Sequence, residues 1–187
     1  MRKKPKLSYL VRKSLRKSWL RIIGDFGSGK TTLTQKYCQE RKIEFPLSHE
    51  LKFDFIEQKK NILGHIMLYD TKGQEKYKSL PRQYYERTYG AILVYDVTNR
   101  DSFLHLKDWF QNLKEYCQQI YTLIIGNKVD LEALRTVKTE EGMEFAKLQN
   151  SAFFETSKDS PKVPEIFEFL FSGLAIFLAM NFILRCA

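Results

Sequence analysis

The chain has 187 residues, of which 43% are hydrophobic and 28% charged, so it is long enough for one domain with a real core and is neither collagen-like, low-complexity nor broadly disordered. Its three cysteines lie far apart without clustered histidines, which argues against a disulfide framework or a cysteine-based zinc site and favours a reducing compartment. The net charge of +9 comes from the first 21 residues, which hold nine basic residues and no acidic one, while the rest of the chain is neutral. A nucleic-acid-binding core would carry its own basic face, so no nucleic acid is expected as a partner.

Residues 1–17 are predicted to be a basic N-terminal arm. Apolar residues recur there every three or four positions between Lys and Arg residues, as in an amphipathic helix that lies on an anionic membrane surface. The same composition also suits a mitochondrial transit peptide or a solvated tail that leads into the first strand. All three interpretations stay open at this point.

Apolar β-rich segments alternate with helical patterns through the middle of the chain. Strands are expected at residues 20–23, 53–56, 62–69, 91–97, 123–126 and 153–155, with a hairpin turn at 59–61. Helices are expected at 31–41, 80–87, 102–117, 139–149 and from Pro164 onward. This alternation predicts an α/β fold in which five helices cover a mostly parallel, six-stranded sheet.

The C-terminal segment is unusually apolar. Residues 169–184 carry no charge and as a helix would be about 24 Å long, slightly short of a membrane span. The segment is either the last helix of the domain or a short tail that associates with a membrane. We place the domain at residues 18–172 and the apolar tail at 173–187.

A phosphate-loop pattern opens the first helix. Residues 24–31, GDFGSGKT, match G-x-x-x-x-G-K-[ST] between a strand and a helix. Glycines allow backbone N–H groups to wrap a phosphate, and the helix N-terminus adds a positive dipole. Lys30 is expected to reach the β- and γ-phosphates as a catalytic group, and Thr31 to offer its hydroxyl to Mg²⁺. The residues expected to hold phosphates are Gly27, Ser28, Gly29, Lys30, Thr31 and Thr32.

A second motif follows the third expected strand. Asp70 ends that strand, where a carboxylate faces the ligand crevice of an open α/β sheet and can hold Mg²⁺. Gly73 allows its N–H to approach a γ-phosphate closely, and Gln74 can orient an attacking water. By itself this pattern is also that of a plain turn.

A third motif, Asn127-Lys128-Val129-Asp130, follows the fifth expected strand. The Asp130 carboxylate can accept two hydrogen bonds from guanine, from N1 and the 2-amino group, whereas adenine lacks both donors. The aliphatic stem of Lys128 can lie along a base plane. After a phosphate loop, and in sheet order, these residues favour guanine recognition.

With these motifs in order, the chain resembles the Ras superfamily, and most closely the Rab small GTPases. The Rab-like segments are IGD, DTKGQEKY, QYYERTYGAILVYDVTNRDSF, IGNKVDL and FFETS. The resemblance implies a Mg²⁺-dependent GTP/GDP switch with slow GTP hydrolysis that acts in vesicle traffic on the cytoplasmic face of an intracellular membrane. Effector, exchange-factor and activating proteins would meet its switch face.

The resemblance also assigns further residues. Ser157, the last residue of the FFETS segment, and Lys158, which follows it, would line the guanine. Phe53, Tyr69 and Tyr84 would match the aromatic trio through which Rabs meet effectors, although core packing accounts for them equally well.

Two departures from the family pattern bear on hydrolysis. Phe26 stands beside the expected γ-phosphate position, where Ras has Gly and many Rabs have Ser, and a bulky ring there should obstruct an incoming arginine finger. In the first switch, the best match to the family pattern implies that Ser48 would supply the Mg²⁺ hydroxyl in place of Thr; the alternative is that no residue of this segment contacts Mg²⁺. These departures leave two hypotheses open: a slow GTPase, or a nucleotide-binding interaction module with no useful turnover.

Overall fold

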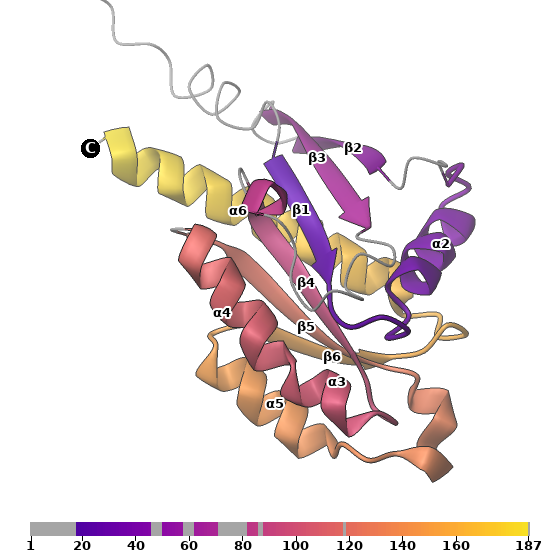
Figure 1. Ribbon diagram of the computed structural model, residues 1–187. Helices are drawn as coiled ribbons and strands as arrows, with labels where there is room; N and C mark the ends of the chain where they lie inside the picture. The colour runs from indigo at the N-terminus through magenta and orange to yellow at the C-terminus, as the bar shows by residue number, and fades with distance from the viewer. Residues whose placement is uncertain are drawn as a thin grey trace, which may run out of the picture.

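The computed structural model describes residues 18–45, 50–57, 62–70, 82–85, 88–117 and 119–186. Its central sheet has the strand order β2-β3-β1-β4-β5-β6 (Figure 1). All neighbouring strands are parallel except β2 and β3, which pair antiparallel with Glu57 opposite Ile62. The strands are β1 (Ser18–Ile23), β2 (Glu50–Glu57), β3 (Ile62–Asp70), β4 (Thr88–Asp96), β5 (Tyr121–Asn127) and β6 (Ala152–Thr156). The predicted α/β fold with a mostly parallel sheet is confirmed, and the expected turn at 59–61 falls in a part of the chain that is not described.

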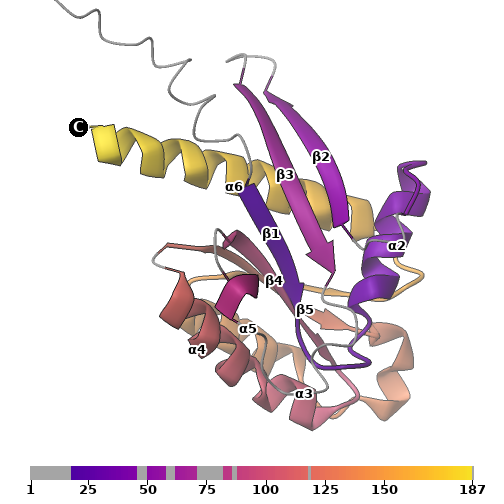
Figure 2. The same cartoon turned by 45° about the horizontal axis from the view of Figure 1, so that its top comes forward.

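Helices cover both faces of the sheet (Figures 1 and 2). Alternate residues of β4 show this directly, because Ile92 and Val94 join one apolar cluster whereas Leu93 and Tyr95 join the other. The first cluster packs the sheet against α2 and α6, and the second packs it against α4 and α5. The helices are α2 (Lys30–Glu40), α3 (Arg100–Leu104), α4 (Leu106–Tyr116), α5 (Thr139–Leu148) and α6 (Val163–Cys186). Burial on both faces explains why the central strands read as continuous apolar segments.

Two predicted helices differ from the structure. Within the expected helix at 80–87, residues 82–84 form only the 3₁₀ turn η2 (Arg82–Tyr84). The expected helix at 102–117 is instead two helices, α3 and α4, which are separated at His105. The His105 ring contacts Asp25 in the loop after β1, so the break coincides with a tertiary contact that the local helical pattern does not report.

Helix α6 is continuous from Val163 to Cys186. Leu174 and Leu178 are buried, and Gly173 lies so close to the Tyr121 side chain that an added Cβ would come within 2.2 Å of its hydroxyl oxygen. Residues 173–186 therefore continue the last helix of the domain rather than beginning a separate segment. Among the described residues, no helix is both long and apolar enough to cross a membrane.

Candidate functional site

The polar ends of several strands meet at one edge of the sheet. In the strand register, Asp70 lies opposite Ile22, while Asp96 lies opposite Asn127, which in turn lies opposite Thr156. This is the carboxyl edge of the parallel strands, where open α/β sheets bind ligands. The loop of residues 24–29 leaves β1 at the same edge and leads directly into α2.

The backbone of this loop has the conformation that its glycines allow. Gly24, Gly27 and Gly29 have φ angles of 145°, 82° and 92°. A Cβ at position 24 would come within 2.1 Å of the Val94 carbonyl oxygen, so a side chain would push the loop away from β4. The first turn of α2 contains no acidic residue to neutralise its positive end. The loop therefore provides two features that favour anion binding, a helix N-terminus and a closely wrapped backbone, as expected.

Lys30 is buried and its ammonium group is turned back into the loop. Its Nζ donates hydrogen bonds to the carbonyl oxygens of Gly24 and Asp25, each at 2.8 Å. These contacts place a positive charge at the centre of the phosphate-loop motif, where the sequence predicts it. Thr31, the next residue, lies half-buried in the first turn of α2.

Asn127 joins the end of β5 to the phosphate loop. Its Nδ2 donates a hydrogen bond of 2.8 Å to the carbonyl oxygen of Ser28. A Cβ on Gly29 would come within 2.2 Å of the same nitrogen, so the approach requires glycine. Within the described part of the chain, Asn127 Oδ1 and Ser28 Oγ are buried and have no hydrogen-bond partner. Buried polar atoms are usually paired, so this pair fits a site that receives a polar ligand.

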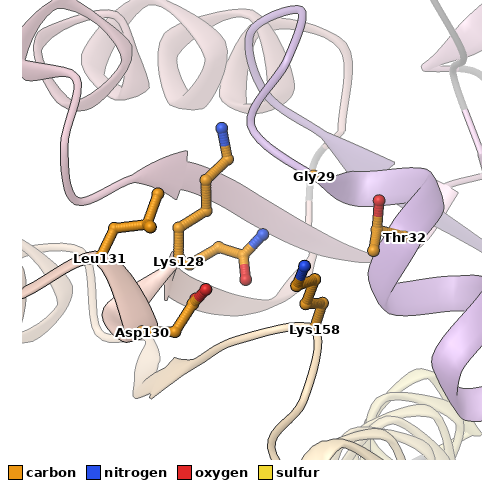
Figure 3. A pocket seen from close by; sticks show the side chains of 7 residues that line it. Gly29, Thr32, Lys128, Asp130, Leu131 and Lys158 are labelled. Atoms are coloured by element: carbon orange, nitrogen blue, oxygen red, sulfur yellow. The ribbon is translucent and has the colours of Figure 1, made fainter.

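A pocket of about 200 Å³ opens beside this contact (Figure 3). Asp130 and Lys158 extend into it from the loops after β5 and β6, and Thr32 faces it from α2. The residues that line it are Gly29, Thr32, Asn127, Lys128, Asp130, Leu131 and Lys158. Six of these seven are predicted nucleotide-binding residues, while Leu131 is an addition. Ser157 is buried next to Lys158 without lining the pocket, and Gly27 lies on the exposed side of the loop.

An ion pair fixes the segment that carries Asp130. Lys128 has a left-handed backbone, with φ 69°, and its Nζ lies 2.5 Å from Asp96 Oδ2. Thr98 also donates to Asp96, from its backbone N at 2.9 Å and from its hydroxyl at 2.7 Å. Burial alone would raise the pKa of Asp96, but the hydrogen bonds from Lys128 and Thr98 outweigh it and hold that pKa below its usual value. Sequence reasoning missed Asp96, although a carboxylate at the end of an apolar strand was a usable signal.

A second carboxylate, Asp25, ties the phosphate loop to the helical layer. Its Oδ1 accepts a hydrogen bond of 2.8 Å from Trp109 Nε1, and its Oδ2 lies 2.6 Å from His105 Nδ1. Both partners are some 80 residues away in sequence. Sequence analysis missed these contacts because nothing in the local pattern of residues 105–109 separates them from core positions.

The Phe26 side chain is 63% exposed on the phosphate loop. Tyr84, from the expected aromatic trio, is half-buried against the second apolar cluster, and the guanidinium carbon of Arg21 lies 5.5 Å from its ring centre. Phe53 and Tyr69 lie on β2 and β3, but their side chains are not described. The Tyr84 side chain is therefore used in part for packing against the core.

Not every predicted site residue falls in the described ranges. Ser48, Gly73 and Gln74 lie outside them, and Asp70 is described only as the last residue of β3. Across the described residues, no cluster of three or more His, Cys, Asp and Glu side chains could hold a metal. The Thr31 hydroxyl and the Asp70 carboxylate are hard oxygen donors that suit Mg²⁺, which usually keeps several waters and binds phosphate oxygens with few protein ligands.

The sequence-family model of the Ras family matches residues 20–175, which is most of the chain. The match includes the phosphate loop, Asp70 and the segment from Asn127 to Asp130. Small GTPases of this kind bind GTP or GDP with Mg²⁺ and interact with regulators and effectors. The chain therefore belongs to the Ras family of small GTPases.

Proposed function

We propose that the protein is a Rab-like switch that binds GTP and GDP, hydrolyses GTP slowly and acts in vesicle traffic on the cytoplasmic face of an intracellular membrane. The observation that carries the switch activity is the contact between Asn127 Nδ2 and the Ser28 carbonyl, which joins the phosphate loop to the pocket that contains Asp130. The Rab-like character rests on the sequence segments around residues 70–77, 83–103 and 153–157.

Each part of a guanine nucleotide has a counterpart in the site. The phosphates would lie over the backbone of residues 27–32, with Lys30 as the positive charge, and the base would occupy the pocket with Asp130 at its polar edge. Lys158 and the stem of Lys128 would flank the base. Thr31 and Asp70, with Ser48 as a further proposed ligand, would hold Mg²⁺, which when bound neutralises charge on the phosphate oxygens.

Hydrolysis would be limited by Phe26. Gln74 would orient the attacking water, and an activating protein of this family would complete the site with an arginine finger worth about 10³–10⁵ in rate. The Phe26 ring is 63% exposed on the phosphate loop, and it would occupy the approach to the γ-phosphate. Intrinsic turnover would continue, while activation in trans would be weak.

Single-turnover GTP hydrolysis, with and without a Rab-activating protein, tests this proposal. Phe26→Ser should restore stimulation by at least tenfold, while Leu148→Ser, at another exposed apolar position on α5, should leave it unchanged. GDP affinity should be the same in all three proteins. Strong stimulation of the unmodified protein would contradict the proposed obstruction.

A second candidate function is that of a nucleotide-binding interaction module without useful turnover. The same exposed Phe26 ring favours it, because an unresponsive phosphate loop leaves the protein bound to GTP. Normal GTP affinity, with negligible hydrolysis in both the unmodified protein and the Phe26→Ser variant, would identify this alternative.

A further inference from the structure

Helix α6 is apolar on two opposite faces. One face is buried against the sheet through residues that include Leu170, Leu174 and Leu178. Away from that face, Ile176 and Met180 are 61% and 59% exposed, and Phe169, whose ring packs edge-on against Phe154 of β6, is 46% exposed. Their spacings of seven and four residues place these three side chains within about 40° of one another around the helix, along roughly 16 Å of its length. A helix that is apolar all round normally has partners on all sides, so the exposed face requires an occupant.

The basic arm joins the domain beside the middle of α6. The arm ends just before Ser18, the first residue of β1, and Leu20 is two residues further on. A Cβ built on Gly90 would lie 2.9 Å from the Leu20 side chain and 3.1 Å from that of Leu174, which places the start of β1 beside the middle of α6. In both views the end of α6 projects past the sheet at the edge where β1 begins (Figures 1 and 2). This edge is opposite the candidate nucleotide site.

The charges at this edge distinguish between possible occupants. Residues 1–17 hold eight basic residues and no acidic one, and residues 169–186 contain a single charge, Arg185. A second copy of the chain on the same face would bring two such arms together, and their like charges would repel. An anionic lipid surface instead attracts the arm and accepts the apolar face, and two such signals together anchor a protein where one does not.

We propose that the Phe169–Ile176–Met180 face of α6 lies in the interfacial layer of an anionic membrane, to which the positive charge of residues 1–17 adds electrostatic attraction. The helix lies along the surface and does not span it. The inference specifies the surface by which the proposed membrane-bound switch attaches, and it depends on α6 and the arm and not on nucleotide hydrolysis.

Vesicle flotation of the full-length chain loaded with GDP tests this inference. The probes are phosphatidylcholine vesicles with and without phosphatidylserine, at low and at physiological salt. We expect binding only with phosphatidylserine, weakened by salt because surface charges are screened. Replacing Ile176 and Met180 by Gln should reduce the partition coefficient by at least tenfold. The matched control replaces Leu134 and Met143 by Gln, at similarly exposed positions in η3 (Val129–Leu134) and α5, and should bind as the unmodified chain does.

The arm is tested by replacing Arg12, Lys13, Arg16 and Lys17 with Gln. Each basic residue near the surface contributes about fivefold to binding, so this variant should lose at least tenfold. GDP affinity, measured separately, should be unchanged in every variant, which distinguishes failed attachment from a failed nucleotide site. Three results would overturn the inference: no binding at low salt, equal loss in the control variant, or a dimer that Ile176→Gln and Met180→Gln dissociate.

Discussion

The contact between the phosphate loop and Asn127 is tested by two glycine substitutions that differ in one respect. Gly27 and Gly29 both have φ angles in the left-handed region, at 82° and 92°. A Cβ at position 27 meets nothing within 4 Å, whereas a Cβ at position 29 would lie 2.2 Å from Asn127 Nδ2. Gly27→Ala therefore introduces backbone strain alone, and Gly29→Ala introduces the same strain and also displaces the amide.

The two costs can be estimated separately. A residue with a Cβ in the left-handed region costs about 1–2 kcal/mol, which is the whole expected effect of Gly27→Ala on the free energy of unfolding. Displacing Asn127 breaks its buried hydrogen bond to the Ser28 carbonyl, which costs about 1–3 kcal/mol more. Gly29→Ala should therefore cost about 2–5 kcal/mol in total. Because the pocket is built around Asn127, GDP affinity should also fall roughly tenfold below that of Gly27→Ala.

Urea unfolding at a fixed GDP concentration measures the stability difference, and independent GDP titrations allow the contribution of bound nucleotide to be subtracted. A double-mutant cycle with Asn127→Ala isolates the contact. In that background the clash is absent, so Gly29→Ala should cost only the strain of about 1–2 kcal/mol. Equal costs for the two glycine variants, or a large cost that persists in the Asn127→Ala background, would refute the reasoning.

Three further predictions concern charged groups of the site. Asp130→Asn exchanges a double acceptor for an amide that also donates, so competition binding should show a shift from guanine toward xanthine nucleotides, and an unchanged preference would exclude Asp130 as the base reader. The pKa of Asp96 is lowered from its ordinary 3.8, so the stability that this group supplies is present above that pH and is lost as the pH falls through the lower folded value. Unfolding measured from neutral to acid pH should therefore decline less steeply in Asp96→Asn, and parallel curves would contradict this. Trp109→Phe keeps an aromatic ring but removes the N–H that donates to Asp25, which should cost about 1–2 kcal/mol in urea unfolding, and unchanged stability would show that this hydrogen bond contributes nothing.

Much of the candidate nucleotide site could be predicted to come together, because its residues occur in short sequence segments. The glycines and Lys30 follow a strand and precede a helix, and the segment from Asn127 to Asp130 follows another strand, so the parallel sheet brings their ends together. The bonds that hold these segments in place were not predictable in this way. Asn127 and Ser28 are 99 residues apart in sequence, and His105 and Asp25 are 80 apart, so no local pattern reports either contact.

The sequence by itself determined the alternation of strands and helices, the motifs at the strand ends and the apolar character of α6. Each of these follows from residue type and spacing, which set burial and backbone conformation locally. Only the tertiary structure decided which face of α6 packs on the sheet, because both faces are apolar and the periodicity does not choose between them. It also decided that Lys128 pairs with Asp96 and that Asp25 binds Trp109. Such pairings depend on which strand ends and helices the folded sheet brings within hydrogen-bonding distance.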